Sequence, residues 1–80
     1  MFFSEGQGAR GKGQVKIMLN GKTKDVSEDT TVLGLLNELD IKLQGIAVEL
    51  NFGIVSRSKY GETILENGDK VEIVRMVGGG

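Results

Sequence analysis

Apolar and polar residues alternate along three stretches of this chain, residues 15–19, 46–50 and 70–76, as they do in half-buried β-strands. Asn20-Gly21 follows the first stretch and predicts a tight hairpin, because both residues tolerate positive φ. Residues 22–26 then form the returning strand, and their polar composition places it near an edge of the sheet. The first and last strands have the cleanest alternation, so we expect them at the sheet centre.

The hairpin also predicts a register for the second strand. A two-residue turn sets Lys22 opposite Leu19 and Lys24 opposite Ile17. Lysine suits such positions only through its long aliphatic stem, which covers apolar neighbours while the ammonium group reaches water. The second strand is therefore expected to contribute lysine stems rather than a regular apolar face.

One amphipathic helix is predicted after the hairpin. Four apolar residues share one helical face through the spacing i, i+3, i+4 and i+7, namely Val32, Leu35, Leu36 and Leu39. Thr31 is the preferred N-cap, with Thr30 as the second choice, because a threonine hydroxyl accepts a hydrogen bond from a backbone N–H of the first turn. This apolar face needs a partner layer, and the sheet supplies it.

Weaker patterns mark the remaining segments. Ile54-Val55 can start a short strand after a turn at residues 51–53, whereas residues 56–66 combine helical and irregular signals. Residues 67–69 (NGD) predict a turn before the last strand. The order strand, strand, helix, strand, connection, strand predicts an α+β fold of the β-grasp (ubiquitin-like) type, with a mixed four- to five-stranded sheet packed on one main helix.

Residues 1–14 lack this apolar periodicity and contain four glycines among polar residues. Such a segment buries too little apolar surface to offset its ordering entropy, so we expect a flexible extension. Its GxGxxG pattern, residues 6–11, lacks the preceding strand that a dinucleotide site needs. The chain is therefore divided into a flexible extension (1–14), a β-grasp domain (15–77) and a flexible Gly-Gly-Gly tail (78–80).

Composition narrows the chemistry. The chain has no Cys and no His, which removes the commonest nucleophile, general base and zinc ligand. Its 10 basic and 11 acidic side chains nearly cancel, so no basic excess points to nucleic acid. Any chemistry is then expected to involve the backbone or a partner's active site, and no metal site is expected. An Asp/Glu or Ser/Lys enzyme stays possible on composition alone.

Two charged groups invite an enzymatic or metal-binding interpretation and do not support it. Residues 56–59 (SRSK) offer Ser and Lys side by side, but adjacent loop residues do not create the hydrogen-bonded geometry of a nucleophile. Four carboxylates follow with a spacing that matches no calcium loop, Glu62, Glu66, Asp69 and Glu72. A solvated face is the better interpretation of both groups.

The sequence gives no signal for a membrane. No stretch approaches the roughly 20 apolar residues of a spanning helix. Phe2 stands where N-myristoylation requires glycine, and the apolar start of the chain stops at Ser4. A cytoplasmic protein is the expectation.

Three glycines, Gly78, Gly79 and Gly80, follow the last strand after Val77. Glycine has no side chain, so such a tail can enter a narrow tunnel and bring its carboxylate to another enzyme's catalytic groups. A carboxylate is a poor acyl donor, but its mixed anhydride with AMP has a good leaving group, which a sulfur nucleophile displaces to give a thiocarboxylate. A frayed, solvated terminus is the competing interpretation.

Four further residues are candidates for contact with a partner. Phe52 follows Asn51 in a turn, where it either anchors a partner or folds back over the core. Met76 and Val77 can pack against a partner as the tail enters its site, or simply pack at the strand end. Arg75 can pair with a partner's carboxylate or remain solvated.

Four segments together resemble a known family. They are VKIMLNGK (15–22), TTVLGLLNEL (30–39), IAVELNFGIVSRS (46–58) and NGDKVEIVRMVGGG (67–80). In this order and spacing they resemble the ThiS/MoaD family of sulfur carriers, and within it most resemble the ThiS, or thiamine-biosynthesis, branch. Gly79 and Gly80 match the family's Gly-Gly end. Ser56 departs from the family pattern, in which proline is common in this loop.

The resemblance implies a β-grasp carrier that is modified at Gly80. Such a carrier is a co-substrate of partner enzymes rather than an enzyme, and it binds no cofactor of its own. An E1-like adenylyltransferase of the ThiF type would activate that glycine with ATP and Mg²⁺, which the partner binds. A cysteine desulfurase or another persulfide source would supply the sulfur. The Gly80 thiocarboxylate would then donate sulfur to a thiazole synthase of the ThiG type, for the thiazole ring of thiamine.

Three alternatives stay open at this stage. A molybdopterin-synthase small-subunit type of carrier, or another thiolation carrier, would use the same chemistry at Gly80 with a different acceptor. A ubiquitin-like modifier would join Gly80 to lysines of target proteins. A plain β-grasp binding module would have an inert tail.

Overall fold

A computed structural model describes residues 13–76. Its strands are β1 (Gln14–Leu19), β2 (Lys22–Ser27), β3 (Ile46–Leu50), β4 (Gly53–Val55) and β5 (Lys70–Arg75). Helix α2 spans Val32–Glu38, and a short 3-10 helix, η1, spans Arg57–Lys59. Two residues of the predicted extension are described. Gln14 belongs to β1 and pairs with Ser27, and Gly13 O accepts a hydrogen bond of 3.0 Å from Glu28 N–H. The rest of the extension and the predicted tail lie outside the described residues.

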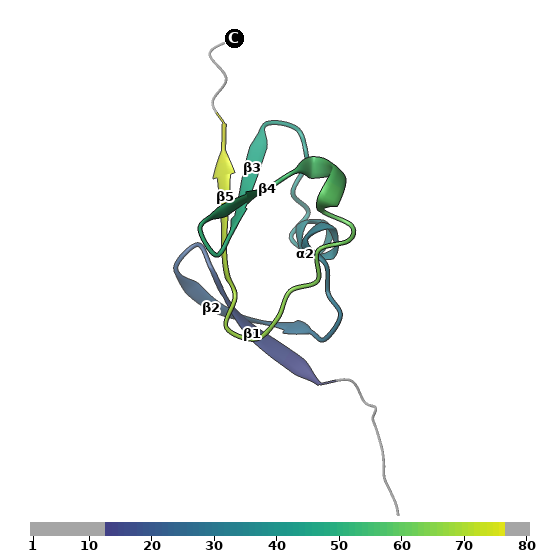
Figure 1. The fold of residues 1–80 in the computed structure, drawn as a ribbon, viewed down its shortest axis with the longest axis vertical. Coiled ribbons are helices and arrows are strands. Elements are labelled where there is room, and N and C mark those ends of the chain that lie inside the picture. Colours follow the sequence, from purple (N-terminus) through teal and green to yellow (C-terminus); the bar gives the residue numbers. More distant parts are fainter. Residues whose placement is uncertain (1–12, 77–80) are drawn as a thin grey trace, which may run out of the picture.

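Within the described residues, the five strands form one mixed sheet in the order β2-β1-β5-β3-β4 (Figure 1). β1 and β5 are parallel, and the other neighbouring strands are antiparallel. Helix α2 packs across one face of this sheet. β5 is the central strand and β1 lies next to it, as the sequence predicts. The start of β1 and the end of β5 lie at opposite ends of the part of the chain that the structure describes (Figure 1).

The hairpin between β1 and β2 has the predicted turn and register. Asn20 and Gly21 have φ values of 48° and 83°, both in the left-handed region that a two-residue hairpin turn requires. Both predicted lysine pairs across the hairpin are present. Lys24 is half-buried and places its Nζ 3.2 Å from Glu38 Oε2 of α2, so its stem covers the sheet edge and its ammonium group meets the helix end.

Helix α2 begins at the predicted cap. The Thr31 hydroxyl accepts a hydrogen bond of 3.0 Å from the Gly34 backbone N–H, which satisfies one of the free donors of the first turn. Val32, Leu35 and Leu36 are fully buried against the sheet, and Leu39, on the same face, is half-buried. The helix stripe is therefore core, as its spacing predicts.

The segment between β4 and β5 contributes to the core although its pattern predicted no regular element. Tyr60 and Leu65 are 4% and 1% exposed. The backbone of this segment is tied to the start of α2, because Leu33 N–H donates to Tyr60 O at 3.0 Å and Leu65 N–H donates to Thr30 O at 2.8 Å. The connection therefore closes the end of the core beside the N-terminus of α2.

Ser56 occupies a backbone position that proline fits. Its φ of −66° and ψ of 145° match the angles that a proline ring imposes, and Val55 before it is extended, as a residue before proline must be. Among residues 13–76, the Ser56 N–H donates no hydrogen bond to the backbone outside the regular elements. The departure from the family pattern therefore leaves the loop geometry intact.

We predict that Ser56→Pro raises the free energy of unfolding by about 0.4–1 kcal/mol, because it restricts the unfolded chain without costing a native hydrogen bond. Chemical denaturation measures the change. Lys59→Pro is the contrasting variant and should destabilise, because it removes the 2.8 Å bond from Lys59 N–H to Ser56 O. A lower unfolding midpoint for Ser56→Pro would show that the serine contributes a contact of its own.

Within residues 13–76, no helix is long and apolar enough to cross a membrane.

Candidate functional site

The strand that leads to the glycine tail is paired on both sides. β5 pairs along its length with β3 on one side, and with the end of β1 on the other. The pairing continues one residue past the strand, because Met76 N–H donates to Gly45 O at 2.7 Å. The backbone is thus held in place as far as Met76. The predicted tail sites Val77, Gly78, Gly79 and Gly80 lie outside the described residues.

Two asparagine side chains extend this anchoring. Asn20 accepts from the Ile73 N–H through Oδ1 at 2.8 Å and donates through Nδ2 to Ile73 O at 3.3 Å, so it takes the place of a strand neighbour where β1 ends. Asn51 accepts from the Lys70 N–H at 2.9 Å and donates to Asp69 Oδ1 at 3.0 Å. Sequence reasoning gave both asparagines a turn role only, since their partners are distant in the chain.

We predict that Asn20→Ala lowers the free energy of unfolding by about 1–3 kcal/mol, from the lost hydrogen bonds and from the cost of alanine at positive φ. Asn20→Gly keeps the turn conformation and loses only the hydrogen bonds, so it should destabilise less. Urea denaturation of both variants separates the two contributions. Equal stability of Asn20→Ala and the wild type would show that the side chain does not hold β5.

Arg75 and Met76 lie together at the end of β5, as their sequence positions require. Arg75 is opposite Ile46 of β3 and borders a shallow groove of about 200 Å³ beside the C-terminal end of α2. No ion pair of Arg75 is present among residues 13–76. Met76 is 57% exposed. Both side chains are accessible next to the point where the tail begins.

Phe52 does not fold back over the core. Its side chain is 83% exposed, and Lys70 Nζ lies 5.1 Å from the ring centroid, in cation–π contact. Asn51 and Phe52 have φ values of 52° and 73°, so they form a two-residue turn that directs the ring away from the core. A bulky residue with positive φ is uncommon and strained, which points to a role other than stability.

The structure separates Phe52 from the other candidate contacts. The ring lies beside Lys70, at the start of β5, whereas Met76 follows the end of that strand. The distance between these two positions is roughly 20 Å, at about 3.3 Å per strand residue. A partner that contacts Phe52 and the root of the tail must therefore extend along β5.

The face of the sheet opposite α2 is named here the open face. Alternation along the paired strands places twelve side chains on it, Gln14, Lys16, Met18, Thr23, Asp25, Ser27, Ala47, Glu49, Ile54, Lys70, Glu72 and Val74. Several of its apolar members are exposed, and Ile54 is 70% exposed. Sequence patterns identified the alternation, but only the strand order shows which of these residues are neighbours.

The other charged groups do not assemble into a site. Lys59 Nζ lies 3.9 Å from Glu62 Oε1, an exposed ion pair that contributes little to stability. In the part of the chain that the structure describes, no three Asp or Glu side chains are grouped as a metal site needs.

The site therefore consists of a firmly held central strand, an accessible strand end and a glycine tail beyond it. Residues 13–80 match the sequence profile of the ThiS family. The chain belongs to the ThiS family. A solved ThiS, the thiamine biosynthesis protein of Geobacter metallireducens, has the same fold, with a TM-score of 0.74 and 32% sequence identity over 82% of this chain and 100% of that one. The predicted β-grasp fold and the predicted family are thereby confirmed.

Two other relatives of this ThiS-family chain differ greatly in length. The sulfur carrier protein ThiS of Bacillus subtilis is 37% identical over 65 residues, which cover 80% of this chain and 98% of that protein. The thiazole synthase of Paramagnetospirillum magneticum is 41% identical over 66 residues, which cover 82% of this chain and 20% of that protein. The ThiS-family chain thus spans only a fifth of the length of this second relative.

Proposed function

We propose that this ThiS-family chain is a sulfur carrier for the thiazole ring of thiamine, and that its own part in the chemistry is the carboxylate of Gly80. The observation that carries the proposal is the family match, which runs through β5 and includes all three glycines. A relative of similar length, the ThiS of Bacillus subtilis, is named a sulfur carrier protein, and this supports the same function for this chain.

The proposed activation converts a poor acyl donor into a good one. A Gly80 carboxylate oxygen attacks the α-phosphorus of ATP, and pyrophosphate leaves. The terminal sulfur of a persulfide then attacks the carbonyl carbon of the acyl adenylate, and AMP leaves. A second thiol attacks the S–S bond of the resulting acyl disulfide at the sulfur that belongs to the persulfide donor. The other sulfur stays on Gly80 as a thiocarboxylate, and the attacking thiol and the donor's sulfur are left joined as a disulfide.

The partners supply every catalytic group in this scheme. An E1-like adenylyltransferase binds ATP and Mg²⁺, a cysteine desulfurase or another persulfide source provides sulfur, and a thiazole synthase accepts it. The chain itself acts as a co-substrate and holds no cofactor. The absence of Cys and His from the sequence suits this role, since none of the steps needs them on the carrier.

A relative that is named thiazole synthase favours the thiamine branch over a molybdopterin-synthase type of carrier. A region similar to this chain forms part of that protein. The acceptor activity and the carrier-like region therefore occur in one polypeptide, which supports the pairing of this carrier with a thiazole synthase.

The test is intact mass spectrometry of the full chain after incubation with an E1-like adenylyltransferase, ATP, Mg²⁺ and a persulfide source. The expected result is a mass gain equal to the replacement of one oxygen by sulfur, located at Gly80 by fragmentation. Omission of ATP is the control and should prevent the gain. An unmodified chain with an enzyme that loads another ThiS would overturn the proposal, and isopeptide-linked adducts would instead indicate a protein modifier.

A further inference from the structure

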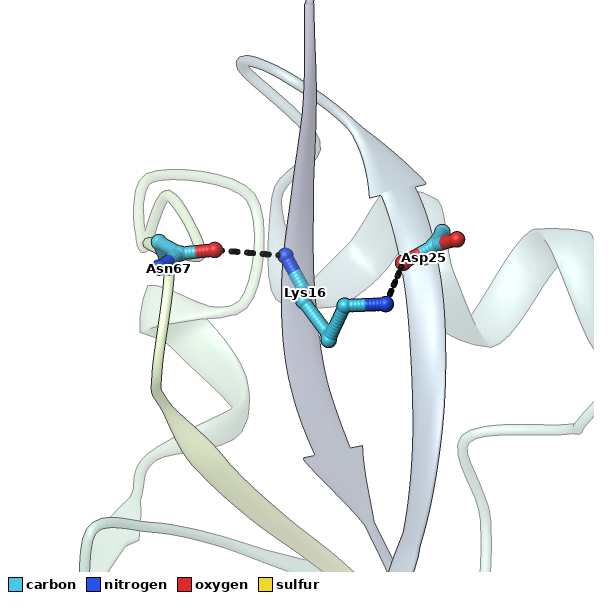
Figure 2. A network of polar contacts seen from close by, with 3 residues as sticks. All are labelled: Lys16, Asp25 and Asn67. Atoms are coloured by element: carbon cyan, nitrogen blue, oxygen red, sulfur yellow. Dashed lines mark hydrogen bonds and ion pairs between the residues drawn. The ribbon is translucent and has the colours of Figure 1, made fainter.

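The longer outer edge of the sheet is unpaired within the described residues. β2 has one strand neighbour, β1, and β4 at the opposite edge spans only three residues. The side of β1 that faces away from β2 is occupied, because the Lys16 N–H donates to Asn67 Oδ1 at 2.9 Å and Lys16 O accepts from the Gly68 N–H at 2.8 Å (Figure 2). The six residues of β2 therefore offer the longest free strand edge in residues 13–76.

The hairpin register shows which backbone groups point outward from this edge. The Glu28 N–H donates to Gly13 O at 3.0 Å, so the even-numbered residues of β2 turn their N–H and C=O groups toward β1. The odd-numbered residues Thr23, Asp25 and Ser27 turn theirs away from it. Ser27 O accepts from the turn that follows, and the other outward groups have no hydrogen-bond partner in the part of the chain that the structure describes. Their spacing of two residues matches the repeat of an incoming strand.

The charges along this edge leave one positive group unbalanced. Lys16 Nζ pairs with Asp25 Oδ1 at 3.0 Å (Figure 2), and Lys24 Nζ pairs with Glu38 Oε2 at 3.2 Å. Lys22 is exposed and forms no ion pair within residues 13–76. An acidic residue directly opposite Lys22 on an added strand would therefore complement the edge.

An apolar side chain also has a place beside this edge. Thr23 lies opposite Met18 of β1, whose side chain is 39% exposed. Both residues line a groove of about 300 Å³ that extends to Gly68. A large apolar residue opposite Thr23 would lie over the threonine and cover Met18, which removes apolar surface from water.

A second copy of the chain does not fit the edge. Two copies of β2 that pair antiparallel about a two-fold axis at the middle of the strand set either Lys24 opposite Lys24 or Asp25 opposite Asp25. Like charges directly opposite each other are destabilising, and charged side chains are a common protection against pairing between identical edges. The same charges accept a strand of different sequence that carries its acidic residue at the matching position.

We propose that the outer edge of β2 binds an extended acidic segment of another protein, which adds antiparallel as a sixth strand of the sheet. The segment places an apolar residue opposite Thr23 and the acidic residue that follows it opposite Lys22. Its backbone pairs with the free groups of Thr23 and Asp25 and with the Ser27 N–H. The inference does not depend on the proposed function, since β1 lies between β2 and the strand that leads to the tail.

Amide hydrogen exchange of the full chain, followed by NMR, tests the strand addition. The probe is an eight-residue peptide of threonine and valine with isoleucine-glutamate at its centre and both ends blocked. At a peptide concentration of ten times Kd, the amides of Thr23, Asp25 and Ser27 should exchange about tenfold more slowly. Those of Lys22 and Lys24 already bond to β1 and should not change. The same peptide with lysine in place of glutamate is the control and should give no protection.

Two pairs of variants test the backbone and the charge separately. Thr23→Pro removes an outward N–H without breaking a bond to β1, so it should weaken binding at least tenfold and keep the wild-type melting temperature. Thr23→Val keeps the N–H and should bind like the wild type. Lys22→Glu should weaken binding roughly fivefold. Lys42→Glu makes the same charge change at an exposed position outside the edge and should have no effect.

The exchange pattern decides the inference even if Thr23→Pro does not fold. Protection of the three odd-numbered amides, lost in Lys22→Glu and kept in Lys42→Glu, supports it. Binding without protection would show an ionic contact only, and protection at β4 would show that the other edge takes the strand; either result overturns the inference. Protection that rises with protein concentration in the absence of peptide would assign the edge to a second copy and overturn it too. None of these results concerns sulfur loading at Gly80, so the two proposals can fail separately.

Discussion

Removal of Gly79 and Gly80 should abolish sulfur loading completely and leave the fold unchanged. The proposed chemistry takes place at the Gly80 carboxylate, so a chain without it offers the adenylyltransferase no acyl group in the right position. The core residues that the structure shows all lie between Ile17 and Val71, and the backbone is anchored as far as Met76. Mass spectrometry after the loading reaction and a thermal melt measure the two effects separately.

The matched control removes two residues from the other end of the chain, Met1 and Phe2, and should load sulfur normally. We expect the melting temperatures of both truncated forms to match that of the full chain, since both truncations leave the core that residues 13–76 form intact. A truncated form without Gly79 and Gly80 that still gained sulfur would place the modification elsewhere. A large drop in its melting temperature would show that the tail is part of the folded structure.

Leu36→Ala should cost about 2–5 kcal/mol of folding free energy, because the side chain is fully buried between α2 and the sheet and its removal leaves a cavity. Domains of this size rarely have more than about 3–5 kcal/mol in total. The variant should therefore be largely unfolded near room temperature, and circular dichroism with urea titration measures the loss.

Asn37→Ala is the control for this substitution. Asn37 is the next residue on the same helix, and its side chain is exposed, so we expect a change within about 0.5 kcal/mol. Similar stabilities of the two variants would mean that Leu36 is not packed in the core as the structure shows.

Local patterns predicted the features that depend on neighbouring residues. The Asn20-Gly21 turn determines the hairpin register, and the Thr31 cap and the helix stripe follow from side-chain geometry within a few residues. The clean alternation of the first and last strands also predicted their place. Both are paired on two sides, and each contributes a buried core residue, Ile17 and Val71.

Features that depend on distant pairing were not predicted. Tyr60 and Leu65 are core residues because their irregular segment is tied to the start of α2 across the fold, which no periodicity reveals. The sequence left open whether Phe52 anchors a partner or folds back over the core, and two successive positive φ values in its turn place the ring outside the core. The facing of Glu49 and Glu72 follows from the β3–β5 register, which is set by the whole sheet and not by either strand alone.

The hydrogen bond from Met76 N–H to Gly45 O also limits how far Gly80 can lie from the sheet. Gly80 lies four residues beyond this anchor, and four residues span at most about 14 Å when fully extended. An enzyme that acts on Gly80 must therefore bring its reactive centre within that distance of the sheet end. The β-grasp domain is too wide to follow the tail into a narrow tunnel. The proposed reaction therefore requires a partner whose reactive centre lies no deeper below its docking surface than the four residues after Met76 can extend.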